Sequence, residues 1–252
     1  NNRKMSRLLI FTSLLVVAQS LLGMWTVTLQ LLPQVVTAHL FGGFTIFSLL
    51  FLRLVHVYNY DRDTRMASSA PPSSALSSSS GRTWIIACGY GGLALVIMQI
   101  FLGGWVSTNY ASLACTDFPL CGGEWVPEAD FVGGFNLLHP IGENYEGGVL
   151  DTQAQIAIHW AHRVGALLVT LFWVGFYLVA RIKKLPLQDN LSIILGVLLL
   201  QIILGITNVL GDLPLLVATA HNAVAAILLL SVLWLLFCIH YQKSIIQADP
   251  DR

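Results

Sequence analysis

The amino-acid sequence predicts an all-α membrane protein, a polytopic bundle of six transmembrane helices derived from a duplicated four-helix unit. Of its 252 residues 56% are hydrophobic and only 10% are charged, whereas soluble domains carry about 25% charged residues. The apolar residues fall in six runs of about 20 residues or more, long enough to cross a hydrocarbon core about 30 Å thick. These runs are residues 8–29, 34–57, 84–106, 156–180, 191–210 and 215–240.

An internal repeat is the third observation, and it relates the first two spans to the last two. Residues 19–39 read QSLLGMWTVTLQLLPQVVTAH, and residues 201–221 read QIILGITNVLGDLPLLVATAH. Three pairs share one offset of 182 residues: Gln19 with Gln201, Gly23 with Gly205, and His39 with His221. Self-similarity at a fixed offset is typical of a reused structural unit. The sequence therefore predicts a helical hairpin with a buried histidine that occurs twice.

The charged residues are sorted by side, which predicts the orientation in the membrane. The loop 107–155 has seven acidic residues and no Lys or Arg, while basic residues flank the other connections and both termini. By the positive-inside rule, both termini lie in the cytoplasm and the loop 107–155 lies outside, as expected of a multi-pass protein of a bacterial inner membrane. The net charge is zero, so the composition does not suggest a nucleic-acid partner.

A Ser/Pro/Ala tract divides the chain into two parts. Residues 61–83 read as a flexible cytoplasmic linker. Residues 84–242 form a unit of four spans, and residues 1–60 hold only two. Because these two spans repeat the last two in the same orientation, residues 1–60 are interpreted as the remnant of a second four-helix unit whose first two helices would precede residue 1. The alternative is a protein that naturally has six spans.

The outer loop 107–155 is long for a simple connection, which suggests a functional cap. Five residues separate Cys115 from Cys121 in this loop. Because thiols outside the membrane meet an oxidising compartment, a local disulfide is predicted. A metal site is less favoured, since His139 is the only histidine nearby, and a redox-active cysteine pair is a further alternative.

Four histidines are placed at one depth near the outer ends of three spans: His39, His159, His162 and His221. Titratable side chains are costly in membrane helices and usually face the bundle interior. Imidazole nitrogens bind haem iron, and facing helices supply an apolar slot. His162 and His221 are the predicted axial pair, His159 lies one turn before His162, and Arg163 is a candidate partner for a haem propionate.

These residues resemble the haem A synthase family. The resemblance rests on HWAHRVGALL at 159–168, CTDFPLC at 115–121, GGWVSTNYASLAC at 103–115, LQLLPQVVTAHLFGGF at 29–44, and the glutamine–glycine hairpins. Within the family it is closest to the proteobacterial type. It implies an eight-helix protein in which the methyl group of haem O is oxidised to the formyl group of haem A for cytochrome oxidase. It also implies haem b on His162 and His221, and substrate haem O on His39.

The resemblance also implies what this sequence lacks. The family's catalytic glutamate and first histidine would precede residue 1, so the chain is expected to be an inactive fragment of an oxidoreductase. His159 occupies the place that corresponds to this glutamate in the second half, as a candidate neighbour of the haem site. Implied partners are the lipid bilayer, a haem O-forming membrane enzyme and an electron acceptor.

Two other classes of protein remain open from the sequence. A di-haem b-type electron carrier would explain the histidines without modifying its haem, although it would not explain the long acidic loop with two cysteines. A transporter whose histidines relay protons would bind no iron.

Overall fold

The computed structural model describes residues 2–65 and 79–248, and it is helical. The helices are α1 (Asn2–Thr28), α2 (Pro33–Arg65), α3 (Ser79–Thr108), α4 (Phe131–Gly134), α5 (Thr152–Ile182), α6 (Gln188–Leu210) and α7 (Leu215–Ala248). All except α4 contain a stretch long and apolar enough to span a membrane. The predicted fold class is confirmed: the chain is a multi-pass membrane helix bundle. Each helix extends at one or both ends beyond the predicted apolar span.

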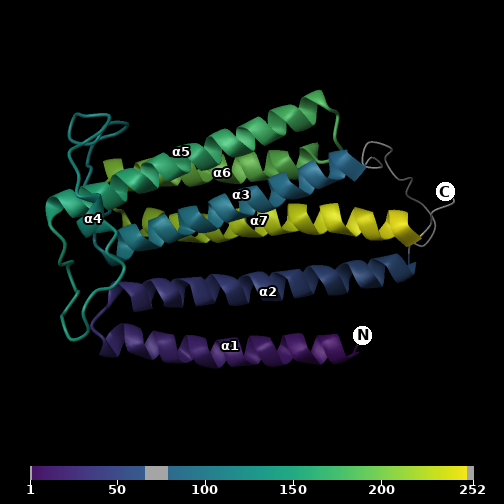
Figure 1. The fold of residues 1–252 in the computed structure, drawn as a ribbon, viewed down its shortest axis with the longest axis horizontal. Coiled ribbons are helices and arrows are strands. Elements are labelled where there is room, and N and C mark those ends of the chain that lie inside the picture. Colours follow the sequence, from purple (N-terminus) through teal and green to yellow (C-terminus); the bar gives the residue numbers. More distant parts are fainter. Residues whose placement is uncertain (1, 66–78, 249–252) are drawn as a thin grey trace.

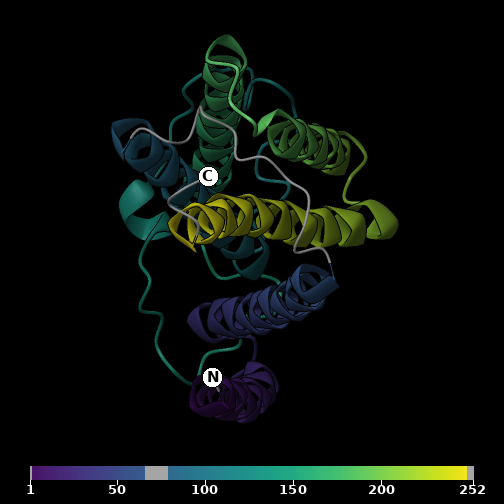
Figure 2. The ribbon, with the colours of Figure 1, turned by 90° about the vertical axis from the view of Figure 1, so that its right-hand side faces the viewer.

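Four helices form a closed bundle, which Figure 2 shows end-on. Going around the bundle, α3 packs on α5, α5 on α6, α6 on α7, and α7 on α3. Within the described residues the backbones of α5 and α7 do not approach each other, so these two helices are diagonal partners across the interior. The predicted axial histidines are on this diagonal pair, since His162 is in α5 and His221 is in α7.

The other two long helices are attached to one side of this bundle. Helix α2 packs against α3 and α7, and within the described residues α1 packs against α2 alone. The main buried cluster lies inside the four-helix bundle, around Trp173 and Phe176 of α5 and Leu235 of α7. Between Leu9 and Thr28, α1 has no buried residue. The main buried cluster of the described residues therefore spans residues 85–239.

The two repeated hairpins have the same turn geometry. Gln30 and Leu31 have φ of 51° and 61°, and Asp212 and Leu213, at the same 182-residue offset, have φ of 55° and 57°. In each turn the second residue donates its backbone N–H back to the end of the preceding helix, at 2.8 Å from Leu31 and 2.9 Å from Leu213. Two consecutive left-handed non-glycine residues are rare, so their recurrence supports the repeat.

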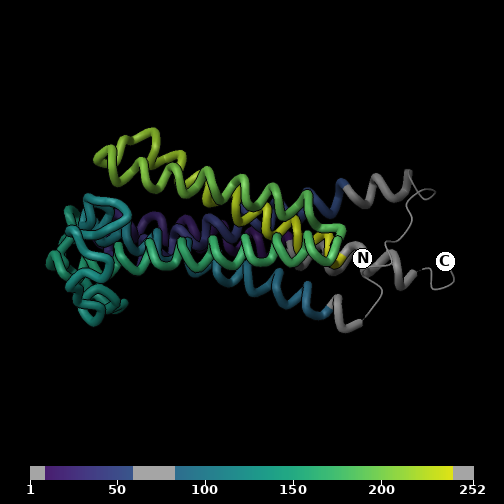
Figure 3. Tube along the Cα trace, turned by 90° about the horizontal axis from the view of Figure 1, so that it is seen from above, coloured from purple at the N-terminus to yellow at the C-terminus, as the bar shows by residue number. Residues whose placement is uncertain are grey.

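The long helices run side by side between two chemically different ends (Figure 1). The connection between α3 and α5 gathers at one end of the bundle (Figure 3), together with the α1–α2 and α6–α7 turns. The basic connection with Lys183 and Lys184 lies at the other end, where α1 begins. This agrees with the charge sorting, while the orientation in the membrane stays a prediction. Part of the predicted linker, residues 66–78, lies outside the described residues, and the division into domains also stays a prediction.

Candidate functional site

The outer loop is organised around a disulfide between Cys115 and Cys121, as the sequence predicts. Inside the ring that it closes, the Asp117 carboxylate accepts backbone N–H groups from Gly122 and Gly123, both at 2.8 Å. These bonds hold the pKa of the Asp117 carboxyl below its usual range. Both glycines have positive φ, 63° and 82°, a conformation that residues with a Cβ seldom adopt. The segment is therefore a fixed turn.

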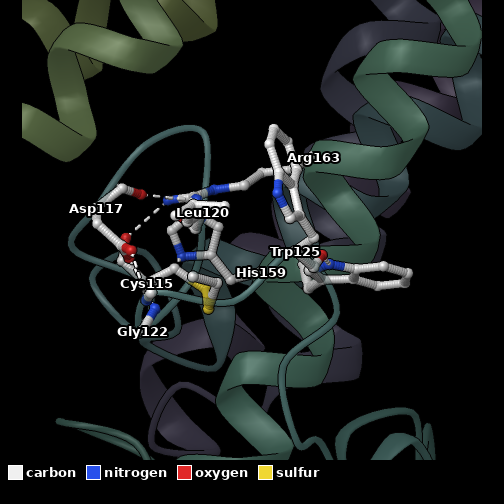
Figure 4. The surroundings of a disulfide bond; sticks show 10 residues. Cys115, Asp117, Leu120, Gly122, Trp125, His159 and Arg163 are labelled. Carbon is white, nitrogen blue, oxygen red and sulfur yellow. Dashed lines mark hydrogen bonds between the residues drawn. A yellow bond between two sulfur atoms is a disulfide. The ribbon is translucent and has the colours of Figure 1, made fainter.

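Arg163 of α5 fastens this turn to the helix bundle (Figure 4). Its guanidinium donates to three backbone carbonyls of the loop, those of Cys115 at 2.7 Å, Asp117 at 2.8 Å and Leu120 at 2.7 Å. A guanidinium has five N–H donors, so two remain after these bonds. The predicted pairing of Arg163 with a haem propionate stays a prediction, and the principal partner in this structure is the loop.

His159 also contacts the loop, one helical turn before His162. It is buried, with 4% of its surface exposed. Its Nδ1 accepts the backbone N–H of Cys115 at 3.3 Å, and Figure 4 shows the ring beside Cys115. His159 and Arg163 thus attach the same loop from one face of α5. A direct role for His159 in a haem site stays a prediction.

The other three candidate histidines, His39, His162 and His221, share one packing arrangement. Each ring points at a glycine of the preceding long helix, His39 at Gly23, His162 at Gly103 and His221 at Gly205. A Cβ added to these glycines would lie 3.0, 3.0 and 3.1 Å from the ring Cε1. Only a residue without a side chain leaves this space for the imidazole.

The depth of these rings in the bundle is also common to all three. Each glycine lies five residues before the end of its helix, at Thr28, Thr108 and Leu210. At 1.5 Å per residue the three rings are therefore about 7.5 Å from the loop end of the bundle.

The ring nitrogens fit a metal-ligand role. The Nδ1 atoms of His39 and His221 are buried and have no hydrogen-bond partner. The Nδ1 of His162 lies 3.0 Å from the Gln99 amide nitrogen, so Nε2 is the ring nitrogen on the side away from Gln99. Imidazole nitrogens on facing helices are the usual axial ligands of a haem held inside a bundle. The residues present therefore fit a haem between α5 and α7.

Two residues of this site were not identified from the sequence. Gln99 and Gly103 form the same Gln-x-x-x-Gly pattern as the two repeated hairpins. The internal repeat does not include them, because Gln99 precedes His162 by 63 positions, whereas Gln19 precedes His39 by 20. The short pattern itself, QIFLG at 99–103, was the available signal.

The outer loop also crosses to the other pair of helices. Gln34 of α2 donates to the backbone carbonyl of His139 at 2.8 Å, and the backbone N–H of Tyr145 donates to Gln30 in the α1–α2 turn at 3.0 Å. The His139 ring is buried against Trp105 and Tyr145, with ring centroids 5.9 and 5.5 Å apart. We call residues 136–148 the strap, because they connect the loop end of the four-helix bundle with the turn between α1 and α2.

The strap is expected to open as the pH falls below about 6.5. Burial lowers the pKa of His139, and the nearby Glu143 opposes this shift only in part. Because the folded pKa lies below that of the unfolded chain, about 6.5, the stability contribution is complete above pH 6.5. It is lost as the pH falls towards the folded pKa. The measurement is the amide hydrogen-exchange protection of residues 136–148, relative to the intrinsic exchange rate at each pH, at pH 7.5 and 5.5.

The matched control is His139→Phe, which keeps a ring of similar size in contact with Trp105 and Tyr145 but cannot take up a proton. In this variant the protection of the strap should not decrease between pH 7.5 and pH 5.5. Equal pH dependence in both proteins would contradict the assignment to His139.

Comparisons with known proteins decide the family. The sequence pattern of the cytochrome oxidase assembly protein family matches residues 1–233. This chain belongs to the haem A synthase family. It is 38% identical over 245 residues to Heme A synthase of Shewanella oneidensis, an alignment that covers 94% of this chain and 68% of that protein.

More distant members of the haem A synthase family match as well. Heme A synthase of Nitrosospira multiformis is 29% identical over 79% of this chain, and that of Neorickettsia sennetsu is 26% identical over 91%. The chain spans 50% and 63% of the length of these two relatives. The family resemblance predicted from the sequence is thus confirmed.

Proposed function

We propose that this chain is part of an oxidoreductase that converts haem O to haem A for cytochrome oxidase, in a bacterial inner membrane with both termini in the cytoplasm. Membership in the haem A synthase family supports the reaction class. The observation that carries the proposal is the placement of His162 and His221 on the two diagonal helices of the four-helix bundle.

His162 and His221 would hold haem b through their ring nitrogens, and His39 would supply a ligand to the substrate haem O. When bound, haem b supplies a one-electron carrier beside the substrate. The protein contributes imidazoles fixed against glycine, an apolar interior, and a loop closed by the Cys115–Cys121 disulfide. The two N–H groups of Arg163 that the loop does not use are available to a propionate.

The electron balance requires a carrier and an acceptor. Conversion of a methyl group to a formyl group adds one oxygen atom. When this oxygen is counted as water, four electrons and four protons leave the substrate. An electron acceptor must therefore take up these electrons, and a membrane enzyme that forms haem O must supply the substrate.

Product analysis tests this function directly. Membranes that contain the whole enzyme of which this chain is proposed to be a part are supplied with haem O, and the extracted haems are separated by chromatography. We expect a formyl haem to form, and His39→Ala to reduce its formation by at least about tenfold, because a lost ligand to the substrate haem removes its positioning. Unchanged haem O, in a protein that binds haem b, would instead support an electron carrier that does not modify its haem.

A further inference from the structure

The histidines His39, His162 and His221 each face a glutamine and a glycine that stand four residues apart on the preceding long helix. The pairs are Gln19 with Gly23 on α1, Gln99 with Gly103 on α3, and Gln201 with Gly205 on α6. Residues four apart lie on the same helix face. The glycine leaves space for the ring. The glutamine, one helical turn further from the loop end of the bundle, contacts the histidine.

The contact of Gln99 with His162 has two points. Its amide Nε2 lies 3.0 Å from the backbone carbonyl oxygen of His162 and 3.0 Å from the ring Nδ1. Gly165, three residues after His162, leaves space for this amide, because a Cβ there would overlap the Gln99 Oε1. The two contacts relate the ring to its own backbone and so restrict its rotation.

The contact of Gln201 with His221 is different. Gln201 Nε2 lies 3.2 Å from the ring Nε2 of His221, the nitrogen opposite to the one that Gln99 contacts. Val224, which is buried, stands three residues after His221, where the histidine of α5 is followed by Gly165. The two sites thus differ in this residue and in the ring nitrogen that the glutamine contacts.

We propose that Gln99 is a positioning residue that fixes the His162 ring with Nε2 directed to the haem iron. This inference rests on the proposed haem ligation. A ligating histidine needs a partner on its other ring nitrogen, which sets the tautomer and the ring plane. In this structure Gln99 Nε2 donates to Nδ1, whereas iron ligation through Nε2 requires Nδ1–H. The Gln99 Oε1 is buried without a hydrogen-bond partner, so a half turn of the amide gives Nδ1–H this acceptor in exchange for the bond to the His162 carbonyl. Removal of such a partner typically weakens metal affinity about 10- to 100-fold.

The test compares Gln99→Leu with Gln155→Leu in the full chain purified from membranes. Gln155 lies on the same helix as His162, two turns earlier, and contacts the Asn109 carbonyl at 3.4 Å. Each protein, depleted of haem, is titrated with haemin, and the low-spin g values of the complex are measured by electron paramagnetic resonance. We expect Gln99→Leu to bind haemin about 10- to 100-fold more weakly with shifted g values, and Gln155→Leu to match the wild type.

A second variant keeps the test decisive if Gln99→Leu does not fold. Gln99→Glu preserves the shape and offers a carboxylate to Nδ1–H, which strengthens the imidazole as a donor. It should retain haem with altered g values, whereas unchanged g values would mean that Gln99 only fills space and would overturn the proposal. Wild-type affinity and g values in Gln99→Leu would overturn it too. His162→Ala, measured in parallel, separates the hypotheses, because full haem binding there refutes the ligation and not the role of Gln99 alone.

Discussion

Replacement of His162 or His221 by alanine is expected to abolish the bound haem b, with occupancy below about a tenth of the wild-type value. Under the proposed ligation, each imidazole would supply one of the two protein ligands that hold the haem between α5 and α7. Neither the alanine methyl group nor the apolar side chains around it can supply a replacement ligand. The measurement is a pyridine haemochrome assay together with a reduced-minus-oxidised spectrum of the purified protein.

The matched control is His240→Ala. His240 is also on α7, but its Nδ1 lies 2.9 Å from the Leu236 carbonyl and its ring packs against Tyr90. This variant should retain haem b in full. If both His162→Ala and His221→Ala keep a normal low-spin spectrum, the axial assignment is wrong. A folded wild-type protein with no haem at all would favour the transporter class.

Replacement of Arg163 by alanine is expected to release the disulfide turn from the bundle. The change leaves three loop carbonyls without their charged donor. Hydrogen bonds to a charged group contribute about 1.5–3 kcal/mol each, but the three act together and Arg163 is partly exposed. We therefore expect a loss of about 3 kcal/mol in local stability, or about a hundredfold more frequent opening. Amide hydrogen exchange of residues 109–127 measures the opening.

Two variants separate this role from a general effect of charge. Arg163→Lys keeps the charge but lacks the planar fork that reaches three carbonyls, so it should restore only a small part of the protection. Arg181→Ala removes an arginine of the same helix whose guanidinium contacts the Tyr177 hydroxyl at 3.4 Å and lies 5.9 Å from the centroid of that ring, and exchange in the loop should not change. Full protection in Arg163→Lys would show that charge alone holds the turn.

The helices could be predicted because their signal is local. Runs of apolar residues predicted all six spans, and the shared offset of Gln19, Gly23 and His39 predicted that two hairpins would have matching turns. The Cys115–Cys121 disulfide followed from the short spacing and the expected compartment. These features need no knowledge of which segments meet in space.

The partners of Arg163 and Gln99 depend on contacts between distant segments. Arg163 binds carbonyls 43 to 48 residues away. The path of this loop depends on the Asp117 carboxylate and on the positive φ of Gly122 and Gly123, and no periodic pattern in the sequence predicts it. For an arginine at the end of a span, an anionic group of a ligand was the simpler prediction. Gln99 reaches His162 only because α3 and α5 are neighbours in the bundle, which the order of the spans does not reveal.

The residue three positions after the histidine differs between the repeated hairpins, and so does the contact that the glutamine makes. Gly42 and Gly165 leave the glutamine amide room beside the backbone, whereas Val224 stands at this position after His221, and there the glutamine contacts the ring instead. The two repeated hairpins share turn, spacing and depth but differ at this position. Duplicated hairpins can therefore keep one fold while the glutamine contact moves from the backbone of the histidine to its ring.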